Sequence, residues 1–122
     1  MSLTLHPFTM TKICTSIEQS KKLIESGIDK TTSDMHYDKD SLENYYSPIP
    51  LIGKYSEIHD QFPCCSLAAL LNIIGNIFKY SLDYNGISFI LTVGDFEVTN
   101  KTAVDACYDM IVKLNELKLL QL

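Results

Sequence analysis

The chain has 122 residues, 46% of them apolar and 20% charged, which suffices for one compact domain with its own hydrophobic core. Ten lysines, no arginine and fifteen carboxylates leave a formal charge of -5, whereas nucleic-acid binders need a surplus of basic side chains. No stretch reaches the roughly 20 apolar residues of a membrane span, and the first residues lack the pattern of a secretory signal. We therefore expect a cytoplasmic protein that binds neither nucleic acid nor membrane.

The amino-terminal part of the chain predicts an arm followed by a helix. Residues 1–11 show no periodicity and are expected to be a leader or a flexible arm. In residues 16–26, apolar side chains recur at helical spacing. Thr15 followed by Glu18 fits a capping box, and Gly27 can adopt the left-handed conformation that closes a helix.

The next segment, residues 29–62, is polar and rich in tyrosine. Its part from 34 to 60 contains six carboxylates and two lysines, a net charge of -4, and so carries most of the charge of the chain. Two prolines and a glycine interrupt it. We expect a solvated surface loop with two short strands, around Met35–Tyr37 and around Leu51–Tyr55.

The next part of the chain, after Ser66, predicts a short buried helix followed by a meander of three strands. Ser66 is a good N-cap for the apolar stretch after it, in which Leu and Ile recur at helical spacing. Beyond Gly75 the apolar period changes to two, and an Asn-Gly pair between alternating runs is a strong hairpin signal. The predicted strands are Ile77–Leu82, Ile87–Val93 and Phe96–Val98.

The chain closes with a predicted amphipathic helix, about Ala103–Leu119, capped by Thr102 with Asp105 or by Asn100. The fold class is therefore α+β, with a small three-stranded antiparallel sheet packed against about three helices. We expect residues 12–122 to form this single domain.

The four cysteines lack the spacing of a disulfide framework, so reduced thiols are expected, with Cys14 and Cys107 on the apolar faces of helices. A metal or thiol site would use His36, His59, Cys64 and Cys65, which lie in one region of the sequence. Adjacent cysteines converge poorly on one tetrahedral metal, so these two are expected to point in opposite directions, with one in the core. A thiol before a helix would be acidified by the helix dipole, yet no nucleophile motif accompanies it.

Four of the seven tyrosines fall in the acidic segment: Tyr37, Tyr45, Tyr46 and Tyr55. Tyrosine is enriched at recognition surfaces, so this segment is a candidate docking surface for a protein partner. The alternative is that the rings fold back over the core. No cofactor is expected, because the chain has no glycine-rich phosphate-binding loop.

Three segments carry a resemblance to a known family: TSIEQSKKL at residues 15–23, PCCSLAALL at 63–71 and NKTAVDA at 100–106. They resemble, in the same order, recurring motifs of a family of short proteins of unassigned activity from prophage-like and mobile-element regions of gut anaerobic bacteria. Cys65 stands where that family has Trp, and the single Pro after Asn in the third motif is replaced by three residues. The resemblance implies a bacterial, mobile-element origin and no catalytic residue.

On the first helix, Gln19 and Lys22 are expected to be exposed and available to a partner. We expect a non-enzymatic module that acts through protein–protein contact, with self-association as a homodimer favoured by a surplus apolar tail of four leucines. The alternative is a small enzyme or a ligand-binding or metal-binding protein that uses the region from His36 to Cys65. A weaker alternative is an acidic mimic of nucleic acid.

Overall fold

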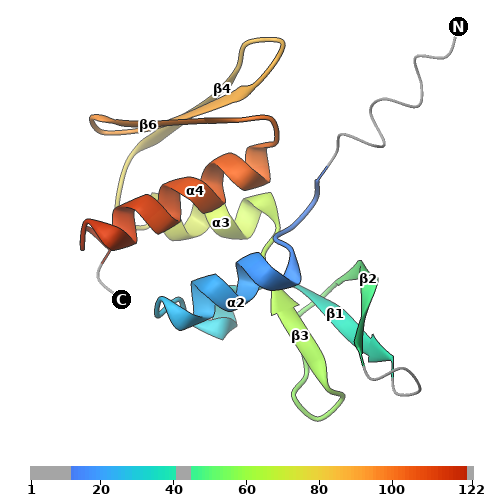
Figure 1. Cartoon of the computed structure of the whole chain (residues 1–122). Helices are drawn as coiled ribbons and strands as arrows, with labels where there is room; N and C mark the ends of the chain where they lie inside the picture. Colours follow the sequence, from blue (N-terminus) through green and yellow to red (C-terminus); the bar gives the residue numbers. More distant parts are fainter. Residues whose placement is uncertain (1–11, 41–44, 121–122) are drawn as a thin grey trace, which may run out of the picture.

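The computed structural model describes residues 12–40 and 45–120, so the arm expected for residues 1–11 lies outside the described part. Within it the chain forms three α-helices, one 3₁₀ turn and two three-stranded antiparallel sheets (Figure 1), which confirms the α+β class. In chain order the elements are α2 (Ile17–Glu25), η1 (Lys30–Thr32), β1 (Met35–Asp40), β2 (Tyr45–Ile52), β3 (Gln61–Cys64), α3 (Leu67–Gly75), β4 (Tyr80–Tyr84), β5 (Phe89–Val93), β6 (Phe96–Asn100) and α4 (Ala103–Glu116).

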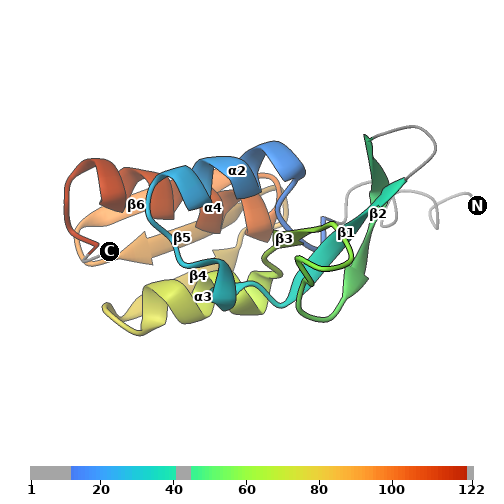
Figure 2. The same ribbon diagram turned by 90° about the horizontal axis from the view of Figure 1, so that it is seen from below.

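The two sheets lie at opposite ends of the molecule (Figures 1 and 2). One sheet has the strand order β4-β5-β6 and packs on α4, with α3 packed against α4 in turn. The other has the order β2-β1-β3 and meets α2 through β3. The sequence predicted only the first of these sheets, so the second is a correction.

The N-cap of helix α2 lies one residue later than predicted. Ser16 is the N-cap: its hydroxyl accepts the Gln19 N–H at 3.1 Å, and the Gln19 side chain accepts the Ser16 N–H at 3.0 Å. The predicted pairing of Thr15 with Glu18 is therefore wrong, because the Thr15 hydroxyl is buried and bonds elsewhere. Gly27, at φ 104°, follows the helix in the left-handed conformation, as predicted.

The segment that was expected to be a solvated loop forms the second sheet instead. β1 contains the predicted strand around Met35–Tyr37 and continues to Asp40, whereas β2 ends at Ile52 and includes only the first two residues of the strand expected around Leu51–Tyr55. Prolines are tolerated in β2 because it is an edge strand and pairs only with β1. Part of the acidic charge is neutralised locally, since Lys39 lies 3.3 Å from Asp60.

Helix α3 starts at its predicted cap, where the Ser66 hydroxyl accepts the Ala69 N–H at 3.3 Å. The carboxylate of Asp34, just before β1, accepts the Ser66 N–H at 2.8 Å and also the Ser66 hydroxyl. A carboxylate at a helix N-terminus is stabilised by the helix dipole. This contact therefore fastens the start of β1 to α3.

The predicted meander of three strands is confirmed, with shifted boundaries. β4 starts at Tyr80 rather than at Ile77, because the N–H groups of Ile77 and Phe78 still bond to the Ile74 carbonyl at the end of α3. The last helix, α4, ends at Glu116 and is capped by Thr102, whose hydroxyl accepts the Asp105 N–H at 3.0 Å.

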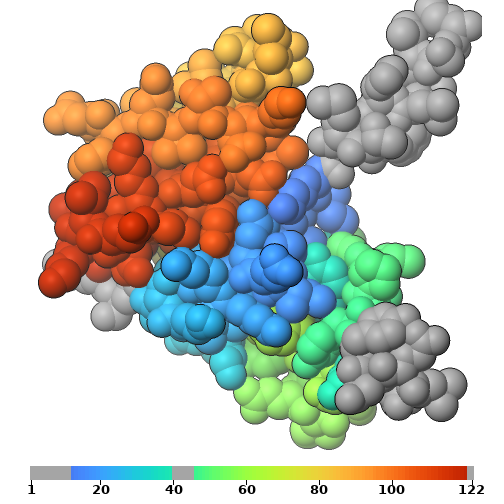
Figure 3. Space-filling model, in the orientation of Figure 1, coloured from blue at the N-terminus to red at the C-terminus, as the bar shows by residue number. Residues whose placement is uncertain are grey.

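Buried apolar side chains form two clusters. The main core joins α3, α4 and the β4-β5-β6 sheet around residues such as Leu70, Leu91 and Met110, which are 0% exposed. A smaller core contains Cys14, Met35, Tyr37 and Cys64. Leu23 of α2 belongs to the main core, whereas Ile17 packs against the smaller one. Figure 3 shows the segment from residue 12 through α2 lying between the two halves, so it connects them.

Candidate functional site: a buried thiol pair and an open sheet edge

The structure separates the four residues of the predicted thiol or metal set. His36 is buried in β1, with Nδ1 2.7 Å from the Gly53 carbonyl oxygen and Nε2 3.6 Å from Asp38 Oδ1. His59 is exposed in the turn before β3. Among residues 12–40 and 45–120 there is no group of three His, Cys, Asp or Glu side chains that could hold a metal. The geometry of this region therefore gives no support to a shared site of the two histidines and two cysteines.

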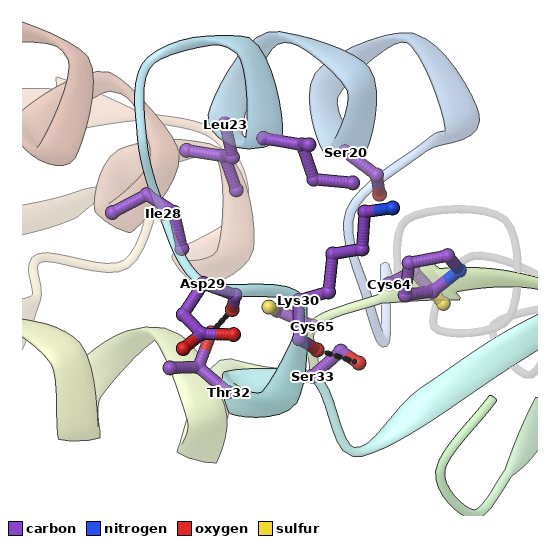
Figure 4. Close-up of a pocket in the computed structure, with 11 residues that line it drawn as sticks. Ser20, Leu23, Ile28, Asp29, Lys30, Thr32, Ser33, Cys64 and Cys65 are labelled. Atoms are coloured by element: carbon purple, nitrogen blue, oxygen red, sulfur yellow. Dashed lines mark hydrogen bonds between the residues drawn. The ribbon is translucent and has the colours of Figure 1, made fainter.

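The adjacent cysteines point to opposite sides of the chain, as predicted (Figure 4). Cys65 lies in the main core and Cys64 in the smaller one, so both are buried, whereas only one was expected in the core. Burial is the largest influence on the Cys65 thiol and raises its pKa to about 11.

Cys64 has a thiol neighbour that sequence spacing does not reveal. Its S–H points at the sulfur of Cys14, with the two Sγ atoms 3.7 Å apart, and the Tyr37 hydroxyl lies 3.5 Å from Cys14 Sγ. The same hydroxyl donates to the Thr15 carbonyl at 2.9 Å. Cys14 was expected on a helix; it instead lies in the extended segment before α2, in an isolated β-bridge with Ser66.

These contacts make the two thiols unequal. The hydrogen bond from Cys64, opposed by burial and assisted by Tyr37 and Lys12, lowers the pKa of Cys14 to about 7. The same hydrogen bond and burial raise the pKa of Cys64 above its ordinary value. Burial, followed by the contact with Cys14, raises the pKa of Tyr37. The pair thus joins a readily ionised thiol to a neighbour that holds its proton.

The remaining thiol, Cys107, is 0% exposed in α4, and burial raises its pKa to about 12. An unfolded thiol loses its proton near pH 9, so above that pH the unfolded state binds fewer protons than the folded state. We expect the free energy of unfolding to fall between pH 9 and pH 11, by about 1.4 kcal/mol per pH unit for each of Cys64, Cys65 and Cys107, because the fold raises all three pKa values. Urea titrations at pH 8.5, 9.5 and 10.5 measure this slope.

The variant Cys107→Ala supplies the control for this pH dependence, because it removes one of the three thiols with a raised pKa and should make the slope shallower. An equally steep slope in the variant would contradict the assignment to Cys107. The lowered pKa of Cys14 has the opposite effect on the free energy of unfolding. It raises this free energy as the pH rises from about 7 to 9, and above pH 9 it no longer changes the pH dependence.

The tyrosines of the acidic segment whose side chains the structure describes do not share an open face. Tyr37 is buried, which corrects its assignment to a docking surface, and Tyr46 is half-buried with its ring edge against Phe62 at 5.5 Å between centroids. Tyr55 is half-buried as well, and the side chain of Tyr45 lies outside the described residues. The alternative interpretation, rings folded back over the core, fits Tyr37 and Tyr46.

Gln19 was also expected to be free for a partner, and this is wrong. Gln19 donates to Asp105 at 2.8 Å and accepts from Lys12 at 2.8 Å, while Lys12 forms an ion pair with the same carboxylate at 2.8 Å. This network connects the start of α2 to the first turn of α4. Lys22 is exposed, as expected.

The leucine tail that suggested an interface is partly folded back. Leu120 is 6% exposed and belongs to the main core, whereas Leu117 and Leu119 are exposed; Leu122 lies outside the described residues. The surplus apolar surface at this end is therefore smaller than the sequence suggested.

Exposed aromatic rings lie instead on β4, which sequence reasoning treated only as a meander strand. Tyr80 is 42% and Tyr84 58% exposed, and β4 is the edge strand of its sheet. An open groove lined by α3 residues and Tyr80 runs beside it. Gly75 permits this approach, since a Cβ there would lie 3.2 Å from Tyr80 Cε2. The signal available in the sequence was the pair of tyrosines that flank Leu82.

Comparison with known proteins adds no family to these observations. No protein-family model matches the chain, and neither a curated protein nor a solved structure matches it. The resemblance to the mobile-element family thus remains a prediction. In the part of the chain that the structure describes, every helix is too short or too polar to cross a bilayer.

Proposed function

We propose that this chain is a non-enzymatic protein–protein interaction module of the bacterial cytoplasm, of mobile-element origin, and that it acts through the free edge of β4 by pairing with a second copy of itself. The observation that carries the proposal is the exposed strand Tyr80–Tyr84, which pairs with β5 on one side and has a free outer edge, and whose sequence is nearly symmetric about Leu82. An edge strand presents unpaired N–H and C=O groups that can extend the sheet of another chain.

The free backbone groups of β4 can be assigned from the hairpin. Asn85 N–H donates to the Ser88 carbonyl at 3.1 Å, so Asn85 bonds toward β5. In an antiparallel ladder, bonded positions alternate. Tyr80, Leu82 and Tyr84 therefore direct their N–H and C=O groups away from β5, to the free edge.

An antiparallel pair of β4 strands centred on Leu82 matches residue with residue. Each Tyr80 lies opposite Tyr84 of the second copy, and each Ser81 lies opposite Asp83 of the second copy. Aromatic cross-strand pairs stabilise such ladders, and a serine hydroxyl can donate to a carboxylate. A two-fold axis through Leu82 makes both halves of the interface equivalent, as in most homodimers.

The charges at this edge favour a second copy although the whole chain is acidic. Lys79 immediately precedes β4, and four positions separate it from Asp83, so an extension of the strand by one residue would place both side chains on one face. In the pair centred on Leu82, each Asp83 would lie diagonal to Lys79 and to Asp83 of the other copy, so two attractive diagonal pairs outnumber one repulsive pair. A short strand interface is small, so we expect dissociation constants of roughly 1–100 μM.

The other edges are less suitable for pairing. β2 and β3 contain prolines, which lack the N–H that a ladder requires. β6 is free on one side, but its apolar side chains are half-buried against the main core and its outward residues are polar. β4 alone among the described strands combines a free edge with two exposed aromatic rings.

Charge reversal at exposed positions tests the dimer without disturbing the core. Lys79→Asp places four carboxylates together and Asp83→Lys places four lysines together, so each should raise the dissociation constant about tenfold or more. The double variant restores opposite charges and should return the dissociation constant to within about threefold of the natural chain. Sedimentation equilibrium from about 1 μM to 1 mM measures all four proteins.

Two outcomes contradict the proposal. A natural chain that is monomeric throughout this range would exclude the dimer, and equal affinities in all four proteins would place any dimer on another surface. A monomeric natural chain whose binding to another protein is lost in the three variants would also contradict self-pairing, and would assign the edge to that other protein.

A further inference from the structure

The second core holds a chemical feature that protein–protein contact does not use, the pair Cys14 and Cys64. The two residues come from separate elements, the extended segment before α2 and the end of β3. Backbone hydrogen bonds hold these elements together, since Thr15 N–H donates to the Cys65 carbonyl at 2.9 Å and Cys65 N–H donates to the Thr15 hydroxyl at 3.0 Å. The sulfur atoms are therefore kept as neighbours by the fold, at 3.7 Å.

Their surroundings assign different roles to the two sulfurs. Cys14 accepts the hydrogen bond of Cys64, lies beside the Tyr37 hydroxyl and is under the positive charge of Lys12, which together favour its thiolate; Asp34 acts in the opposite direction. A lower pKa makes Cys14 the better nucleophile near neutral pH. Cys64 keeps its proton until its partner has reacted.

We propose that Cys14 and Cys64 are a modification site, at which hydrogen peroxide oxidises the pair to a reversible intrachain disulfide. The Cys14 thiolate attacks one peroxide oxygen, so that an S–O bond forms and the O–O bond breaks; the leaving hydroxide takes up a proton. The Cys64 thiol then loses its proton, its sulfur attacks the Cys14 sulfenic acid, and the S–O bond breaks as water leaves. The two thiols lose two electrons and two protons, and the peroxide is reduced to two waters.

The burial of the site selects a small oxidant. Cys14 is 3% and Cys64 1% exposed, which excludes direct attack on a bulky disulfide such as oxidised glutathione. A cavity of about 20 Å³ lies beside Cys64 and Cys65, among side chains that include Ser20 and Leu23 (Figure 4). This volume holds about one water, so it admits only a small oxidant; Cys14 is not among the residues that line it. An open groove on another side includes Tyr37, whose hydroxyl lies 3.5 Å from Cys14 Sγ.

The other two thiols provide controls within the same chain. Cys65 and Cys107 have pKa values raised by burial to about 11 and about 12, and neither has a thiol hydrogen-bond partner among the described residues. Both should therefore remain reduced at peroxide concentrations that oxidise the pair. Formation of the disulfide needs the sulfur atoms to move from 3.7 Å to about 2.05 Å, a shift that side-chain rotation and small backbone movement can supply.

The test is a titration of the reduced full chain with hydrogen peroxide at pH 7, followed by intact mass and peptide mapping. We expect a loss of about 2 Da, a crosslink between the peptides of Cys14 and Cys64, and full reversal by dithiothreitol. Cys65→Ser and Cys107→Ser should behave like the natural chain. A natural chain oxidised at Cys14 to sulfinic acid without a crosslink, or one crosslinked through another cysteine, overturns the proposal.

Single variants separate the attacking sulfur from the resolving one. Cys64→Ser should leave Cys14 as a sulfenic acid that dimedone traps, and Cys14→Ser should leave Cys64 unreactive under the same conditions. Trapping at Cys64 in Cys14→Ser contradicts the assigned roles. Circular dichroism of each variant shows whether it has folded, and if one variant is unfolded the other still decides the question. The outcome is independent of dimerisation through β4, which the charge-reversal variants test separately.

Discussion

Leu70→Ala should lower the free energy of unfolding by about 2–5 kcal/mol, a large part of the total of roughly 5–15 kcal/mol expected for a domain of this size. Leu70 lies in the centre of α3, is 0% exposed and packs in the main core. Its truncation removes buried apolar surface and leaves a cavity that the surrounding helices fill only in part. Urea unfolding followed by circular dichroism measures the change.

The same variant tests whether residues 12–122 are a single domain. If the main and smaller cores unfold together, the variant should lower the free energy of opening, measured by hydrogen exchange of backbone amides, by the same amount in β1 as in α4. Leu117→Ala is the matched control, because Leu117 is 49% exposed and its loss should change stability by no more than about 0.5 kcal/mol. Acceleration confined to α4 would show that the two sheets belong to separately folding units.

The helices and the meander could be predicted because their signals are local. Ser66 and Thr102 cap their helices through hydrogen bonds to residues three positions on, and the Asn-Gly turn closes a hairpin between neighbouring strands. Such contacts depend on residues that are close in sequence. The cap of α2 was misplaced by one residue because Thr15 and Ser16 are both good N-caps, and only tertiary packing selects between them.

The second sheet was missed because its strands are polar and interrupted by prolines, although β1 and β2 are longer than the strands of the meander. β1 has two buried side chains on one face, Met35 and Tyr37, and alternates them with His36 and Asp38. The two prolines of β2 are tolerated because β2 is an edge strand of this sheet. A sheet of this kind is specified by the pairing of β1 with β3 and by the contact of β3 with α2 rather than by the periodicity of its strands.

The thiol pair lay beyond sequence reasoning for the same reason. Cys14 and Cys64 are fifty positions apart, and no spacing rule connects an extended segment with the end of a strand. The cysteines that drew attention, Cys64 and Cys65, are adjacent but face different cores. The exposed tyrosines of β4, Tyr80 and Tyr84, were likewise identified only from their exposed fractions in the structure, because the sequence does not show which tyrosines are buried.

Thr15→Val should lower the free energy of unfolding by about 1–3 kcal/mol although the two side chains have nearly the same shape. Thr15 is 0% exposed, and its hydroxyl accepts the Cys65 N–H at 3.0 Å and lies 2.8 Å from the Ser20 hydroxyl. Valine leaves the Cys65 N–H buried without a partner, and that loss outweighs any gain from an added methyl group. Thermal unfolding and exchange of the Cys65 amide measure the effect.

Thr15→Ser is the matched control, because it keeps the hydroxyl and removes only one methyl group, which is worth about 1 kcal/mol. Its Cys65 amide should stay protected, whereas that of Thr15→Val should exchange faster in the folded state. Because the lost contact joins the segment before α2 to the residue after β3, Thr15→Val should also loosen the setting of Cys14 beside Cys64 and slow their crosslinking by peroxide. Equal stability and equal amide protection in both variants would show that the hydroxyl does not hold the two halves together.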